Sequence, residues 1–308
     1  MDIFRGFGAL KQFRNPVVTT GSFDGVHVGH KAIINRLRNL ASLYKGETVL
    51  ITFHPHPRKV LYPESAGKSL RLINTTDEKM LLLEKAGVDN VIIAEFTREF
   101  SRITCEEFVR DYLVSVIGAR VIVVGFNHHF GCNRQGDYNY LWNLKDIYGF
   151  EAEEIPAREV EHETVSSTRI RKAISDGYIQ RANAYLDNHY MIMCFPEEAR
   201  NLPVSDYNFF SAGKIEPDKL IPPGGIYAAS VSVSSDNSRH KCIVLIGENT
   251  DGENGVYFHT PGTGNDYRGK KIILYFHKRL SETLNLYDQR YFSTTVKKAI
   301  EEVSELIY

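Results

Sequence analysis

One string of ten residues reads Gly21-Ser22-Phe23-Asp24-Gly25-Val26-His27-Val28-Gly29-His30. It follows a β-branched run at residues 17–20 and precedes a segment of helical period at about 31–43. A strand that turns directly into a helix brings backbone N–H groups and the positive end of the helix dipole to the carboxyl edge of a sheet. The string therefore predicts a phosphate-binding turn in an α/β domain.

The alternation of strand and helix continues through the first half of the chain. Further strands are predicted at 48–53, 90–94 and 120–124, and further helices at about 77–86, 105–117 and 137–148. Two of these helices begin with capping signals, Thr75-x-x-Glu78 and Thr104-x-x-Glu107. Strands that alternate with helices predict a parallel sheet covered on both faces, with ligands beyond the carboxyl ends of its strands.

The pattern changes after about residue 185. Residues 190–213 have no clear period, and strands are then predicted at 226–233, 241–246, 255–259 and 271–276 between Gly, Pro, Asn and Ser clusters. A last helix is expected at about 287–306, with apolar residues Val296, Ile300, Val303 and Ile307 at helical spacing. We therefore expect an α/β domain at 1–185 and a small antiparallel β-barrel with a C-terminal helix at 186–308.

Composition limits the partners of this protein. The chain has 37 basic and 38 acidic residues among 308, so its net charge is near zero. Such a charge does not favour binding to nucleic acid or to an anionic membrane. The first residues do not read as a signal peptide, no apolar run is long enough to span a bilayer, and four cysteines lie far apart. We expect a cytoplasmic protein with small-molecule substrates, no nucleic-acid or membrane partner and no disulfide framework; its oligomeric state stays open.

The Gly21 to His30 string carries the first group of candidate site residues. Glycines allow close approach of a ligand to the backbone, and two histidines three residues apart share one face of a first helical turn. We expect His27 and His30 to donate hydrogen bonds to phosphate oxygens. The alternative is a tight connection with two surface imidazoles. The residues expected to line the nucleotide are Gly21, Phe23, Asp24, Gly25 and Gly29.

A second candidate group is Val165-Ser166-Ser167-Thr168-Arg169-Ile170-Arg171. The hydroxyls precede a short predicted helix that Gly177 ends, so they could simply be helix caps. With Arg169 and Arg171 so close, we interpret the segment as a clamp on the β- and γ-phosphates of a nucleotide.

Two further loops leave predicted strands. In Val124-Gly125-Phe126-Asn127-His128-His129-Phe130-Gly131, Asn127 could contact a base or ribose, and Phe126 and Phe130 could wall a flat ring. Adjacent histidines point apart, so His128 and His129 do not indicate a metal site. In the loop with His54, Pro55 and His56, the prolines stiffen a segment that either lines an acceptor pocket or is a rigid turn without a ligand.

These strings together resemble the bacterial bifunctional riboflavin kinase/FAD synthetase family over about residues 15–177. The resemblance implies a Rossmann-like N-terminal domain that transfers AMP from ATP to FMN with Mg²⁺, giving FAD and pyrophosphate. It implies that His27 and His30 stabilise the reacting phosphates and that Asn127 holds the nucleotide. The residues that it implies close over the triphosphate are Ser167, Thr168 and Arg171. No protein side chain is expected to be a direct metal ligand.

The second half departs from the pattern of this family. The family's kinase domain carries a Gly-x-Val-x-x-Gly stretch, a Pro-Thr-Ala-Asn string for Mg²⁺ and ATP phosphates, and a Glu that acts as base. Here residues 190–195 read YMIMCF and residues 204–210 read VSDYNFF. Tyr257 stands where the Glu is expected, and a phenol with a pKa of about 10 is a poor base near neutral pH. We expect a riboflavin-kinase-like barrel without kinase activity.

Three functions stay open at this point. The first is an FMN adenylyltransferase whose riboflavin kinase activity is lost. The second keeps both activities and assumes a divergent kinase loop within residues 190–213. The third is a non-catalytic, regulatory flavin or nucleotide binder whose barrel is an interaction module.

Overall fold

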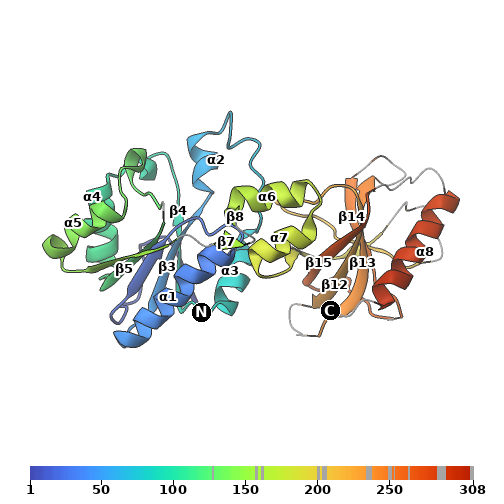
Figure 1. Cartoon of the computed structure of the whole chain (residues 1–308), viewed down its shortest axis with the longest axis horizontal. Coiled ribbons are helices and arrows are strands. Elements are labelled where there is room, and N and C mark those ends of the chain that lie inside the picture. Colours follow the sequence, from blue (N-terminus) through green and yellow to red (C-terminus); the bar gives the residue numbers. More distant parts are fainter. Residues whose placement is uncertain are drawn as a thin grey trace. The chain divides into compact units, whose positions relative to one another are not determined.

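The structure is a computed structural model that describes residues 1–126, 128–156, 159–160, 163–199, 202, 207–233, 238–248, 252, 254–262, 264–282 and 289–305. Its contacts divide the chain into two units, coloured along the sequence in Figure 1. The first unit contains residues Met1–Leu70 and Lys79–Ser166, and the second contains Arg71–Glu78 and Ser167–Tyr308. Among the described residues, no helix has the length and apolar character that crossing a membrane requires.

The first unit is built on a six-stranded sheet with the order β1-β4-β3-β2-β5-β6. Every strand pair in it is parallel. The strands are β1 (Asp2–Arg5), β2 (Val17–Thr20), β3 (Thr48–His54), β4 (Asn90–Glu95), β5 (Val121–Gly125) and β6 (Glu151–Ile155). From β2 the chain winds outward through β3 and β4, and it then returns to β5 on the other side of β2. The sheet therefore changes winding direction between β2 and β5, where ligands of such folds bind.

Helices cover both faces of this sheet, as the alternation predicts. Val17 packs in one cluster with Leu37 of α1, whereas Val18 packs in another with Leu113 and Leu141. The helical elements are α1 (Val28–Leu43), α2 (Pro57–Leu61), α3 (Thr76–Lys85), η1 (Phe100–Arg102), α4 (Cys105–Glu107) with the π-helix η2 (Phe108–Val116), η3 (Cys132–Arg134) and α5 (Tyr138–Tyr148). A short hairpin, β7 (Glu159–Val160) and β8 (Glu163–Thr164), follows β6. The Rossmann-like α/β architecture is confirmed.

Both predicted capping boxes are present. The Thr104 hydroxyl accepts from the Glu107 N–H at 3.2 Å, while the Glu107 carboxylate accepts from the Thr104 N–H at 2.9 Å. Thr75 and Glu78 make the same reciprocal pair at 3.3 and 2.9 Å. These boxes begin α4 and α3 close to the predicted positions.

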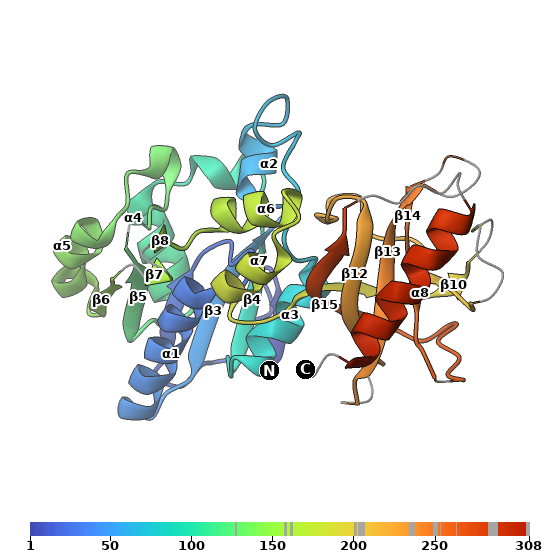
Figure 2. The same cartoon turned by 45° about the vertical axis from the view of Figure 1, so that its right-hand side comes forward.

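The second unit contains a curled antiparallel sheet of seven strands in the order β10-β11-β14-β13-β12-β15-β9. Its strands are β9 (Tyr190–Cys194), β10 (Glu197–Glu198), β11 (Phe210–Ser211), β12 (Gly225–Val233), β13 (His240–Glu248), β14 (Asn254–His259) and β15 (Ile272–Ser281). Helices α6 (Ser167–Ser175) and α7 (Ile179–Leu186) precede the sheet, and α8 (Gln289–Glu305) follows it. Figure 2 shows α8 lying along the sheet, where Phe292, Val296 and Val303 enter the core. The predicted barrel-like sheet with a C-terminal helix is confirmed; Ile307 lies outside the described residues.

Candidate functional site

The turn between β2 and α1 is held in an unusual backbone conformation. Gly25 has φ +98°, but Phe23 and Val26 also have positive φ values, 47° and 41°. Each non-glycine residue in this region costs on the order of 1–3 kcal/mol, and the conformation is least favourable for a β-branched side chain. Both side chains are 2% exposed, so packing holds them in place. Strain that is fixed by packing is typical of a functional turn.

His27 and His30 form a stacked pair at the start of α1. Their ring centroids are 3.7 Å apart with an interplanar angle of 15°, and the Phe23 ring lies 4.8 Å from that of His30. His27 caps α1, because its Nδ1 accepts from the His30 N–H at 3.4 Å, which leaves Nε2 as the protonated nitrogen of the neutral ring. His27 is only 7% exposed. That burial argues against a pair of surface imidazoles.

Burial, more than any neighbouring charge, keeps the imidazole of His30 neutral. Burial lowers its pKa well below the usual value, and the charges of His27, Lys79 and His128 lower it further. The pKa of His128, on the loop after β5, is lowered to about 4 by burial and then by His129 and Arg134. Within the described part of the chain, His30 Nδ1 and His128 Nε2 are buried without a hydrogen-bond partner. The carboxyl ends of β2 and β5 therefore hold unused hydrogen-bonding capacity, which a ligand could satisfy.

Lys79 joins this site, although the sequence interpretation does not single it out. Its Nζ donates to the Ser22 carbonyl at 2.8 Å and to the Thr52 hydroxyl at 3.2 Å. Burial lowers its pKa to about 8, and the charge of Asp24 partly offsets this. One signal was available: Lys79 lies in the first turn of α3, where a positive charge opposes the helix dipole.

The residues expected to contact the flavin occupy different environments. Phe126 is 55% exposed at the end of β5, whereas Phe130 is in the core with its ring centroid 6.0 Å from that of Phe108. His54 and Pro55 are exposed. His56 caps α2, since its Nδ1 accepts from the N–H of the second residue of that helix at 3.2 Å. Asn127 lies outside the described residues. The roles expected of these five residues and of Asn127 stay predictions.

The expected triphosphate clamp belongs to the second unit and begins α6. Ser167 is the first residue of this helix, and Thr168 and Arg169 are exposed. Arg171 donates from Nε to the Arg71 carbonyl at 2.9 Å. The clamp role of this group also stays a prediction.

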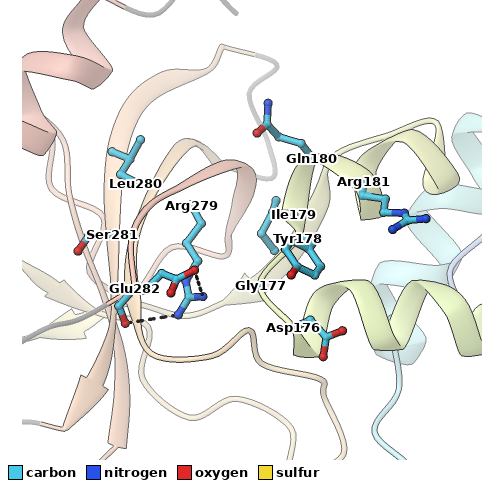
Figure 3. Close-up of a pocket in the computed structure, with 10 residues that line it drawn as sticks. All are labelled: Asp176, Gly177, Tyr178, Ile179, Gln180, Arg181, Arg279, Leu280, Ser281 and Glu282. Atoms are coloured by element: carbon cyan, nitrogen blue, oxygen red, sulfur yellow. Dashed lines mark hydrogen bonds and ion pairs between the residues drawn. The ribbon is translucent and has the colours of Figure 1, made fainter.

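A cavity of about 520 Å³ lies beyond the C-terminal end of α6 in the second unit. Figure 3 shows its lining, which comes from residues 176–181 and 279–282. Arg279 pairs with Glu282 at 3.6 Å and donates to the Gly224 carbonyl at 2.5 Å. None of the predicted site residues lines this cavity. Across the described ranges, no three His, Cys, Asp or Glu side chains are grouped as a metal site would require.

Comparisons with known proteins point to one family. Residues 10–169 match the family described as FAD synthetase. A Listeria monocytogenes protein named bifunctional riboflavin kinase/FMN adenylyltransferase is 30% identical over 76% of this chain and 73% of its own length. A Pseudomonas fluorescens protein of the same name is 28% identical over 97% and 94%, and an FAD synthetase of Listeria monocytogenes is 32% identical over 68% and 84%.

A solved structure shares the fold of the whole chain. It is described as a macrolide-efflux protein from Streptococcus pneumoniae, with a TM-score of 0.88, 22% identity and full coverage of both chains. At that identity the likeness concerns the architecture alone.

Proposed function

The chain belongs to the FAD synthetase family and is a nucleotidyltransferase, and from this premise we propose how its residues transfer AMP from ATP to FMN. The observation that carries the proposal is the stacked pair of His27 and His30 at the start of α1. The pair lies in a strained turn at the position where the sheet changes direction. This place offers two imidazole donors and a helix N-terminus to a phosphate.

The reaction is an in-line displacement at phosphorus. An oxygen of the FMN phosphate attacks the α-phosphorus of ATP, a new P–O bond forms, and the bond from the α-phosphorus to the bridging oxygen breaks as pyrophosphate leaves. His27 and His30 donate hydrogen bonds to the α-phosphate oxygens as negative charge develops on them. Catalysis then comes from positioning and charge stabilisation, without a covalent intermediate.

The remaining predicted residues serve the substrates. Ser167, Thr168, Arg169 and Arg171 hold the β- and γ-phosphates, and Asn127 holds the nucleoside. Mg²⁺ fits as an ion carried by the phosphates, which is its usual mode of binding in such enzymes. The buried carboxylate of Asp24 already interacts with Lys79, which fits an ion held by the substrate rather than by this turn. The ion would neutralise phosphate charge. A cytoplasmic location stays a prediction.

The test of this function is direct product analysis. Incubation with FMN, ATP and Mg²⁺ should yield FAD and pyrophosphate in equal amounts. No FAD at high enzyme concentration would contradict the proposal and would favour a non-catalytic binder.

We further propose that the riboflavin kinase activity is lost. Tyr257, at the expected position of the catalytic Glu, is 6% exposed and packs in an apolar cluster with Phe209 and Phe292. The rings of Tyr207 and Phe209 approach that of His259 at 5.3 and 5.5 Å. An aromatic cluster in this place supports a core rather than a site that activates a ribityl hydroxyl. Residues 203–206, part of the divergent stretch, lie outside the described residues.

The second candidate keeps both activities. It is favoured by the Pseudomonas fluorescens protein, which carries the bifunctional name and matches 97% of this chain. Incubation with riboflavin, ATP and Mg²⁺ separates the two candidates. We expect neither FMN nor FAD from riboflavin. Formation of FMN and FAD together, at a rate comparable to FAD formation from FMN, would show that the kinase is retained.

A further inference from the structure

Lys79 is a buried charged residue of the first unit that the proposed mechanism does not use. Its side chain is 8% exposed, and its ammonium reaches the turn from α3. There it donates to the carbonyl of Ser22, the residue before the strained Phe23. It also donates to Thr52 on β3, whose hydroxyl donates to the same Ser22 carbonyl at 3.1 Å. A closed set of three hydrogen bonds thus ties the turn to the neighbouring strand.

Burying a lysine here costs more free energy than burying an apolar side chain of similar size. The ammonium donates to the Ser22 carbonyl and the Thr52 hydroxyl, which are both neutral. Burying an ammonium costs several kcal/mol unless its charge is compensated. The buried Asp24, also in the turn, supplies part of that compensation. An apolar side chain of similar length would fill the volume without the desolvation cost. The retained charge is therefore better explained by a task at the site.

The position of the charge indicates what Lys79 does at the site. Lys79 interacts electrostatically with His30, whose stacked partner His27 lies in the same helical turn. A fixed positive charge near His30 lowers the energy of an anion that binds to this ring. Because Lys79 is largely buried, solvent screens its interaction with His30 less than it would at the protein surface.

We propose that Lys79 is a positioning residue for adenylyl transfer, which ties the Ser22 carbonyl to β3 and holds a fixed positive charge near the His27–His30 pair. The inference rests on the proposed function. It assigns to Lys79 two effects on one step: it holds the two imidazoles in register with the α-phosphate, and it stabilises the charge that develops there.

The test uses steady-state kinetics of FAD formation by the full chain. Lys79→Met removes the charge and both hydrogen bonds while keeping a long apolar stem. We expect kcat and kcat/KM for ATP to fall together by about 10²-fold, because the lost interaction acts in the transition state. Lys79→Arg keeps a charge and should recover part of the loss. The matched control is Lys85→Met, an exposed position on the same helix, with unchanged kinetics.

Several results would overturn the inference. These are wild-type kcat in folded Lys79→Met, a higher KM for ATP at unchanged kcat, or an Arg variant as slow as the Met variant. If Lys79→Met does not fold, Thr52→Val takes its place, because it removes one acceptor of the ammonium. A lower kcat supports the inference and a wild-type kcat overturns it. Absence of FAD from the wild-type chain would instead count against the proposed function.

Discussion

His30 is the residue whose environment says most about the chemistry. Burial and three neighbouring positive or titratable groups keep its imidazole neutral, and the stacked ring of His27 fixes its orientation. A neutral ring donates a hydrogen bond without giving up a proton, which suits a transfer in which phosphate charge is stabilised. The spacing of three residues predicted that the two side chains share a face. In the structure His27 is the N-cap of α1 and His30 lies in its first turn.

His30→Ala should lower kcat for FAD formation by on the order of 10²–10³, the usual effect of losing one transition-state donor. The variant should remain folded, since the substitution lies in the first turn of α1 and alanine is a good helix former. His240→Ala, on β13 of the second unit, is the control and should leave kcat unchanged. A kcat within twofold of wild type would contradict the role of His30, by the relation between rate and barrier.

The low pKa of His128 predicts a pH dependence of stability. Its folded pKa of about 4 is below the ordinary value of about 6.5 for an unfolded chain, so the unfolded state binds more protons between these values. The free energy of unfolding should therefore fall as the pH is lowered through this window, by up to about 1.4 kcal/mol per pH unit for this group. Urea unfolding from pH 7 to about 4.5 measures the slope, and His128→Gln should reduce it. An equal slope in the variant would contradict the assignment.

At the scale of the elements, the strands that position the site were predictable and several others were not. β2 was predicted at its observed residues because it is a β-branched run between turn signals. β1 is mostly exposed, β6 is only partly buried, and both are rich in charge, so they lack the apolar pattern of a strand. β9 is apolar on both faces, which removes the alternation that marks a half-buried strand.

Lys79 could not be placed from local pattern either. Its acceptors lie 57 and 27 residues away along the chain, so only the folded sheet brings them together. The helix that carries it was predicted, as was its capping box. The sequence does not show which side chains of that helix face the turn.

The start of α1 gives a prediction of its own. A Cβ added at Gly29 would lie 3.2 Å from the His27 ring, so this ring must shift by a few tenths of an ångström. Gly29→Ala should therefore lower kcat about tenfold or more, because catalytic geometry tolerates little displacement. Gly8→Ala is the control, since nothing lies within 4 Å of a Cβ there. Wild-type kcat in folded Gly29→Ala would show that the exact placement of His27 is unimportant.

At the scale of the whole molecule, the two units differ in what they retain. The first unit contains a strained turn, the buried Lys79 and the His27–His30 pair. Among the described residues, His30 Nδ1 and His128 Nε2 are buried there without a hydrogen-bond partner. The second unit keeps its curled sheet and α8, while Tyr257 and aromatic neighbours occupy the expected place of the kinase base. One chain of this family thus combines the turn that we propose binds phosphate with a barrel in which Tyr257 is packed in an apolar cluster.

Product analysis by chromatography tests this account most directly. The full chain is incubated with ATP and Mg²⁺ and with either FMN or riboflavin, in separate reactions. We predict FAD and pyrophosphate from FMN and no phosphorylated product from riboflavin. Failure to form FAD from FMN at high enzyme concentration would contradict the central claim.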